Sequence, residues 1–87
     1  MSSPDYPSCS DYEVIVRLKP EVLDPEARAI QGTLTRIGFA GVKGLQVSKR
    51  YVLSIEDQVA NAAGHAEQIA REYLANPVSE TFQIRKL

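Results

Sequence analysis

The sequence predicts an α+β domain with the element order β-α-β-β-α-β, a two-layer sandwich in which two helices cover one face of an antiparallel sheet. Three observations lead to this prediction. Apolar residues alternate near both ends of the chain, recur with helical spacing in two separate segments, and are dense in a β-rich stretch between those segments. Helices and strands in this order build a four-stranded sheet with one uncovered face.

The first strand follows a short N-terminal segment. Residues 1–10 hold two prolines and four serines without periodicity, so we expect a disordered tail before a single domain at 11–87. From there apolar and polar residues alternate, which is typical of a half-buried strand that ends before Pro20. The residues of one face are Tyr12, Val14, Val16 and Leu18.

The first helix is predicted over 25–37. Asp24 can accept hydrogen bonds from the N–H groups of the first turn, and Pro25 has no N–H to leave unpaired there. Gly38 marks the end, and Arg36 places a cation in the last turn, where the helix dipole favours it. The apolar stripe consists of Ala27, Ile30, Leu34 and Ile37.

Residues 42–55 are predicted to form two strands. Fourteen residues are long for one strand, and a tight turn at 48–50 would divide them, although no Asn-Gly or Asp-Gly pair marks it. A second helix is expected over 57–75, ended by Asn76 and Pro77. Its stripe holds Val59, Ala62, Ala63, Ala66, Ile69, Ala70, Tyr73 and Leu74. The last strand should occupy 78–86.

The uncovered face of this sheet has a mixed composition that suits docking to another protein. Its expected members are Glu13, Ile15, Arg17, Gln46, Ser48, Val52, Ser54, Thr81, Gln83 and Arg85.

Composition excludes several classes of function. Ten Lys and Arg against eleven Asp and Glu give a net charge of −1, so no positive field favours nucleic acid or an anionic membrane. The absence of a long apolar run or signal peptide favours a cytoplasmic protein. One cysteine cannot form an intrachain disulfide, and a domain this small has a thin core, so we expect self-association.

No catalytic, cofactor-binding or metal-binding residues are expected. His65 lies at the edge of the second helix, and Cys9 has no cation nearby to activate it. Helix capping and the helix dipole account for Asp24 and Glu26.

An RNA-recognition domain shares the strand order, but the uncovered face lacks aromatic residues for stacking on bases.

Three stretches together resemble the small PurS subunit of formylglycinamidine ribonucleotide synthase, the ATP- and glutamine-dependent enzyme of purine synthesis. They are YEVIVRLKPEVLDPEARAIQGTL at 12–34, GVKGLQVSKRYVLSI at 41–55 and YLANPVSETFQI at 73–84. Two positions depart from the family. Ala27 stands where a glycine is common, and Ser48 stands where the family's hairpin commonly has glycine.

The resemblance implies a non-catalytic subunit that binds no cofactor itself. It would bridge a glutaminase subunit, which releases ammonia, and a large synthetase subunit, which uses ATP and Mg, and would assist ammonia transfer between them. Dimers within the complex and tetramers alone are both expected. The residues expected at interfaces are Ile15, Arg17, Lys49, Arg50, Val52, Asn76 and Arg85.

Two other functions fit the same topology. A small-molecule-sensing regulatory domain would use the turn after the first strand, but that turn reads KPEVLDP instead of being glycine-rich. A small enzyme of the acylphosphatase kind needs an arginine-bearing phosphate loop, which the same stretch lacks.

Overall fold

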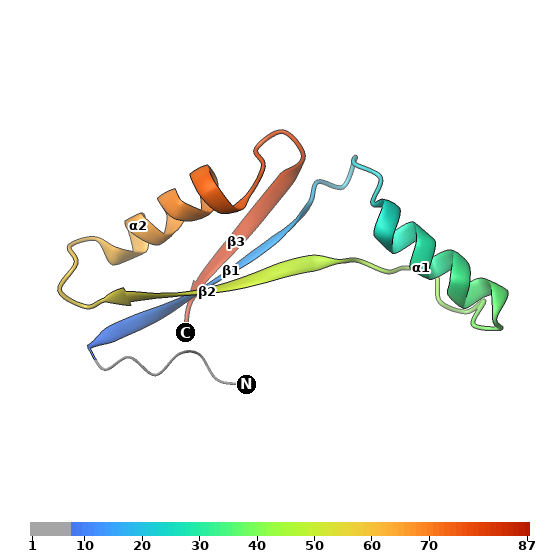
Figure 1. The fold of residues 1–87 in the computed structure, drawn as a ribbon, viewed down its shortest axis with the longest axis horizontal. Helices are drawn as coiled ribbons and strands as arrows, with labels where there is room; N and C mark the ends of the chain where they lie inside the picture. The colour runs from blue at the N-terminus through green and yellow to red at the C-terminus, as the bar shows by residue number, and fades with distance from the viewer. Residues whose placement is uncertain (1–7) are drawn as a thin grey trace.

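The structure, a computed structural model, describes residues 8–87 (Figure 1). Within them, three strands form an antiparallel sheet in the order β2-β1-β3, alongside two α-helices and a π-helical turn. The predicted α+β class and the antiparallel sheet are confirmed. In chain order the elements are β1 Cys9–Leu18, α1 Pro25–Arg36, β2 Ser48–Glu56, α2 Ala62–Ile69, the π-helical turn η1 Ala70–Leu74, and β3 Glu80–Lys86.

The core lies between β1 and the segment formed by α2 and η1. The alternation predicted for the first strand is confirmed, because Val14 and Val16 are fully buried and Tyr12 is nearly so. Val14 lies opposite Tyr51 on β2 and Ile84 on β3, so all three strands contribute to this face. The other residues of the cluster are Ala70, Ala75, Leu53, Leu74 and Phe82.

The second helix begins later than its apolar stripe predicts. Residues 57–61 form turns, and Asn61 has the left-handed backbone (φ 57°) that asparagine tolerates better than most residues. Gly64 follows in the first turn, where a Cβ would lie 2.2 Å from Asn61 Nδ2. The expected start at 57 was wrong, because stripe periodicity does not detect a left-handed residue at 61.

The end of this helix agrees with the prediction. The last turn widens into η1, in which Ala75 N–H donates to Ala70 O at 2.9 Å. Asn76 Oδ1 then accepts from the Val78 N–H at 2.9 Å, and Pro77 prevents the helix from continuing. The last strand, predicted over 78–86, begins at residue 80 because 77–79 form this turn.

Helix α1 forms where predicted but projects away from the sheet as an arm (Figure 1). The molecule measures 52 × 30 × 14 Å, and its Cα radius of gyration is 16.7 Å. A compact domain of this length has a Cα radius of gyration of about 12 Å. Of the helix's predicted apolar stripe only Ala27 is buried, so α1 covers little of its own chain's sheet.

The predicted division of residues 42–55 into two strands is wrong. Residues 48–56 form the single strand β2, which runs through the expected turn at 48–50 because it pairs with β1 there, Arg17 opposite Ser48 and Ile15 opposite Arg50. No glycine in that triplet favours a turn over this pairing. The described residues therefore form three strands instead of four, and residues 42–47 extend past the end of the sheet (Figure 1).

The first strand begins earlier than predicted. β1 begins at Cys9, so it includes the last two residues of the segment predicted as a tail. Ser8 forms a turn before it, and the rest of that predicted tail, residues 1–7, lies outside the described residues.

Candidate interaction surface

The strand register places five of the seven predicted interface residues on one face of the sheet. Ile15 lies opposite Arg50, and its neighbour in β1, Glu13, lies opposite Val52 and Arg85. Side chains two apart on a strand share a face, so Arg17 belongs to the same surface. We call this surface the open face; its predicted interface residues are Ile15, Arg17, Arg50, Val52 and Arg85.

Glu13 joins the three strands on the open face. Its carboxylate pairs with Arg50 Nε at 2.6 Å and with Arg85 Nη2 at 3.2 Å. The hydrogen bond from Arg50 and the charge of Arg85 lower the pKa of Glu13 against an opposing contribution from burial. The Glu13 side chain is only 12% exposed, whereas those of Arg50 and Arg85 are 51% and 69% exposed. Both guanidinium groups are therefore fixed in direction yet accessible to a partner.

The remaining two predicted interface residues lie elsewhere. Lys49 is opposite Val16 and so belongs to the helix-covered side, where it is exposed near the start of β2. Asn76 forms the turn after η1, where its backbone N–H donates to Glu80 Oε1 at 2.8 Å. The structure therefore separates these two residues from the open face and from each other.

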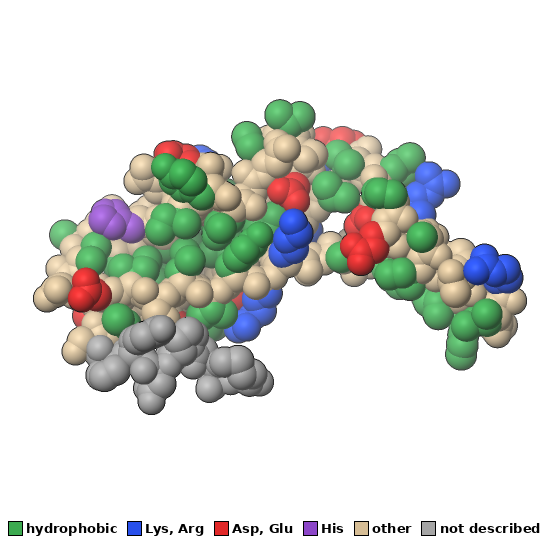
Figure 2. Space-filling view, in the orientation of Figure 1, with side chains coloured by type: hydrophobic (Ala, Val, Ile, Leu, Met, Phe, Trp, Pro, Cys, Tyr) green, Lys and Arg blue, Asp and Glu red, His purple; other side chains and the backbone are tan. Residues whose placement is uncertain are grey.

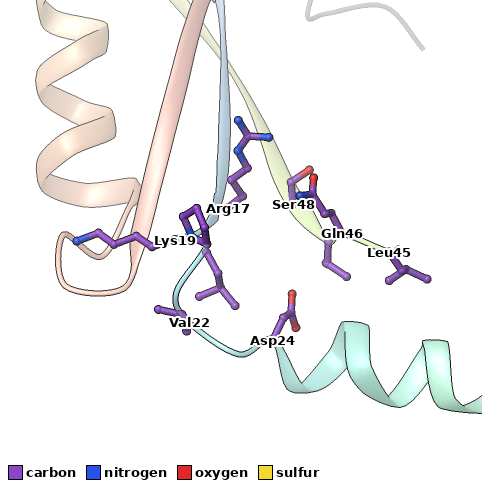
Figure 3. A pocket seen from close by; sticks show the side chains of 10 residues that line it. Arg17, Lys19, Val22, Asp24, Leu45, Gln46 and Ser48 are labelled. Carbon is purple, nitrogen blue, oxygen red and sulfur yellow. The ribbon is translucent and has the colours of Figure 1, made fainter. Parts of the chain in front are cut away.

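A cleft of about 250 Å³ lies where the arm leaves the sheet. It is lined by the end of β1, the loop before α1 and the extended segment before β2 (Figure 3). Arg17 and Lys19 contribute cations, whereas Asp24 contributes a carboxylate whose Oδ1 accepts hydrogen bonds from Glu26 N at 3.0 Å and Ala27 N at 3.1 Å. Asp24 thus acts as the helix cap predicted from sequence.

The arm carries exposed apolar residues that the interface prediction missed. Ile30 and Ile37 belong to the helical stripe that should have been buried, and Leu23 and Phe39 flank the helix. Leu23 is 70% exposed and Ile37 62% exposed; Figure 2 shows hydrophobic side chains at the surface of the arm. The stripe itself was visible in the sequence, but sequence alone did not show that its own sheet would leave it uncovered.

The two groups considered for catalysis, Cys9 and His65, belong to different elements, β1 and α2. Burial, followed by the charges of Glu56, Asp57 and Asp11, raises the pKa of the Cys9 thiol, which disfavours the reactive thiolate. His65 is exposed on α2. Within residues 8–87, no group of three or more His, Cys, Asp or Glu side chains is arranged to hold a metal ion. None of the helices in that range is long and apolar enough to cross a membrane.

Comparison with known families gives one match over nearly the whole chain. Residues 11–87 match the family described as PurS, phosphoribosylformylglycinamidine (FGAM) synthase. The PurS subunit of phosphoribosylformylglycinamidine synthase from Mycobacterium leprae is 38% identical over 73 residues, covering 84% of this chain and 90% of the relative. The corresponding subunit from Methanocaldococcus jannaschii is 36% identical over 73 residues, covering 83% and 88%.

Solved structures give the same result. The M. jannaschii PurS structure, described as one of the subunits of formylglycinamide ribonucleotide amidotransferase in the purine biosynthetic pathway, superposes with a TM-score of 0.79 at 33% identity, covering 90% of this chain and 95% of that one. Bacillus subtilis PurS gives 0.82 at 27% identity, with 90% and 98% covered. A chain in the PurLQS structure from Thermotoga maritima gives 0.77 at 26% identity, with 91% and 98% covered.

Proposed function

The chain belongs to the PurS family of phosphoribosylformylglycinamidine synthase subunits, and from this premise we propose that it bridges the glutaminase and synthetase subunits and assists ammonia transfer between them. It is a subunit of the synthase of purine biosynthesis. The observation that carries the proposal is the match over residues 11–87 together with the likeness to a chain of PurLQS.

The proposed division of labour leaves the chemistry to the other subunits. The glutaminase subunit would release ammonia, and the large synthetase subunit would use ATP and Mg to amidate formylglycinamide ribonucleotide. This chain would bind neither ATP nor Mg. We propose the cytoplasm as the compartment in which the complex works.

The open face is the surface that we propose for the partner subunits. Ile15 and Val52 supply apolar area at its centre, and the arginines 17, 50 and 85 supply guanidinium groups. Arginine is enriched in protein interfaces, and the Glu13 pairs hold two of these side chains in place before binding. A partner segment that carries carboxylates would complement this surface. That Asn76 lies at an interface remains a prediction.

A matched pair of charge reversals tests the open face. Arg17→Glu should weaken binding to the partner subunits at least tenfold, which is about 1.4 kcal/mol. Lys86→Glu makes the same charge change on the opposite face of the sheet, since Lys86 lies opposite the core residue Tyr12, and should leave binding unchanged. Calorimetric titration measures the affinity of each variant for the partner subunits. Equal losses of affinity in both variants would refute the proposal that the open face binds these subunits.

We also propose that the chain self-associates as a dimer or tetramer. Its support is the extended shape of the single chain and the exposed apolar stripe of α1. A helix with an uncovered apolar face is not stable by propensity alone and needs a packing surface. A second chain is one source of that surface.

Complex formation tests the function directly. The chain, the glutaminase subunit and the synthetase subunit should elute together from a sizing column, and omission of the chain should lower the yield of the glutaminase–synthetase complex. A mixture in which this chain always elutes separately would contradict the bridging role.

The small-molecule-sensing alternative is not favoured, because the family and the relatives compared are PurS subunits. Thermal shifts with free amino acids test it further. A saturable rise in melting temperature would argue for a sensor, and we expect none.

A further inference from the structure

We propose that Arg50 and Arg85 act together to bind one carboxylate of a partner subunit, the side chain of an aspartate or a glutamate, on the open face. We call these two residues the arginine pair. This inference rests on the proposed function, in which the open face meets the partner subunits, and it specifies the chemical group that this face recognises.

The first argument comes from the position of the two side chains. β2 and β3 flank β1, so the arginine pair reaches Glu13 from its two sides. Arg85 lies directly opposite Glu13, and Arg50 lies opposite Ile15, the next residue of the same face. Glu13 Oε2 accepts from Arg50 Nε at 2.6 Å, and Glu13 Oε1 pairs with Arg85 Nη2 at 3.2 Å. One carboxylate therefore holds two guanidinium groups of like charge near each other.

The second argument comes from the hydrogen-bonding capacity that Glu13 leaves unused. A guanidinium group carries five N–H donors and accepts no hydrogen bond. Within residues 8–87, Nη1 and Nη2 of Arg50 and Nε and Nη1 of Arg85 donate no hydrogen bond. Both arginine side chains are more than half exposed, whereas the Glu13 side chain is mostly covered. A partner therefore meets the free guanidinium edges and not the Glu13 carboxylate.

The third argument comes from charge. The arginine pair and Glu13 are two cations and one anion, a local excess of +1 on a chain whose net charge is −1. Arg17 adds a further positive charge on the same face, and the carboxylates Asp11 and Glu56 lie nearer the start of β1. One carboxylate would neutralise the excess of the arginine pair, and guanidinium–carboxylate hydrogen bonds are strong and often bidentate.

The fourth argument comes from the surface beside the arginine pair. An open hollow of about 680 Å³ lies there, with apolar and amide side chains in its lining. Its lining residues are Glu13, Ile15, Gln83, Ile84 and Arg85. Ile15 lies opposite both Arg50 and Gln83, so the methylene groups of an acidic side chain would pack on it while the exposed Gln83 amide offers another donor. A protein surface would also exclude water from the pair, which a small free anion would not, and exposed ion pairs are weak.

Arginine-to-lysine variants test whether the geometry of the pair matters. Arg50→Lys and Arg85→Lys keep the charge but replace the planar guanidinium fork by one ammonium group. Each should weaken binding to the partner subunits about tenfold in a calorimetric titration. Arg17→Lys makes the same exchange on the same face outside the pair, and its affinity should stay close to that of the unmodified chain. Equal affinities in all three variants and the unmodified chain would overturn the proposal, because the face would then act through its net charge alone.

Carbodiimide crosslinking identifies the bound group, whatever the size of these losses. In the assembled complex of the Arg85→Lys variant, the introduced amine should form an amide with an aspartate or glutamate of a partner subunit, located by mass spectrometry. Lys86, the neighbouring native amine on the opposite face, is the internal control and should not link to a partner subunit. A link from position 85 to a second copy of this chain, or no link to either partner subunit, would overturn the proposal.

Titration of the isolated chain with inorganic phosphate tests a small anion as the occupant instead. We expect no saturable binding; saturable binding that Arg85→Lys abolishes would assign the pair to a small anion and overturn the proposal. The outcomes also separate this inference from the function. An unmodified chain that binds neither partner subunit would overturn the bridging role and this inference with it. An unmodified chain that binds both, with lysine variants that bind equally well, would overturn the role of the arginine pair alone.

Discussion

Asp24 is the residue that fixes where α1 begins. Its Oδ1 accepts from two backbone N–H groups that would otherwise have no partner in the first turn. The sequence reveals such a residue because capping depends on local geometry alone. The same aspartate lines the cleft at the base of the arm, yet its hydrogen bonds are internal to the helix start.

Asp24→Ala should lower the free energy of unfolding by about 1 kcal/mol, since two N–H groups lose their acceptor. Urea denaturation at one fixed protein concentration measures this. Glu21→Ala, an exposed carboxylate outside the helix, should change stability by less than ~0.5 kcal/mol. Amidation by the complex should be unchanged where the mutant stays folded; a large loss there would show that this end of the arm touches a partner.

Glu13 gives the open face a pH dependence. Its two arginine partners lower its pKa in the folded state below the ordinary value of 4.5. A depressed carboxyl pKa contributes stability that is fully present above the ordinary value and is lost as the pH falls through the folded-state pKa. We expect Glu13→Gln to be less stable than the unmodified chain at pH 7, with the difference closing in acid.

Denaturation at several pH values between 3 and 7 measures the effect. Glu72→Gln, an exposed carboxylate on η1, is the matched control and should show a smaller difference at neutral pH. A Glu13→Gln difference that stays constant across this range would mean that the pairs with Arg50 and Arg85 do not stabilise the fold.

At the scale of elements, prediction succeeded where local rules decide. β1 and α1 follow from alternation and from capping, and the end of the second helix follows from Asn76 and Pro77. Prediction failed where the conformation of a segment depends on pairing with a strand that is distant in the sequence. Residues 48–50 have no strong preference of their own, so the neighbouring β1 determines their conformation. The pairing register of β1 and β2 places Arg50 on the open face and Lys49 on the helix-covered face. The sequence analysis had expected both residues at an interface.

Gly64 controls the start of α2. Alanine normally stabilises a helix by up to about 1 kcal/mol over glycine. Gly64→Ala should gain less than this, because its Cβ would lie 2.2 Å from Asn61 Nδ2 and the exposed Asn61 side chain must rotate to make room. The double variant Asn61→Gly with Gly64→Ala keeps the left-handed position and removes the contact, so it should be more stable than Gly64→Ala in a thermal melt. A single variant that gains the full ~1 kcal/mol would contradict this account.

At the scale of the whole molecule, the single chain is a small core with an attached arm. Among residues 8–87 the largest fully buried side chains are those of Val14 and Val16, which make a thin core for a folded domain. The sequence allowed the helices and the faces of the strands to be predicted. It did not show that α1 and the segment after it would leave their own sheet, because alternation and periodicity are identical whichever chain completes the layer.

Ile30→Asp tests whether the arm is covered in the assembled protein. The residue is already 40% exposed in the single chain, so a charge there would cost little if the arm stayed free. We expect at least a tenfold loss in the dimer association constant by sedimentation equilibrium. Ala29→Asp, at an exposed position outside the apolar stripe of the helix, should have a much smaller effect; equal effects would place the contact elsewhere.

The central claim is that this chain couples a glutaminase to a synthetase. The most direct measurement is the rate at which the two partner subunits form formylglycinamidine ribonucleotide, with and without this chain, from glutamine and separately from ammonium salt. We predict that omission lowers the glutamine-driven rate at least tenfold and changes the ammonia-driven rate far less. An unchanged glutamine-driven rate without the chain would contradict the account.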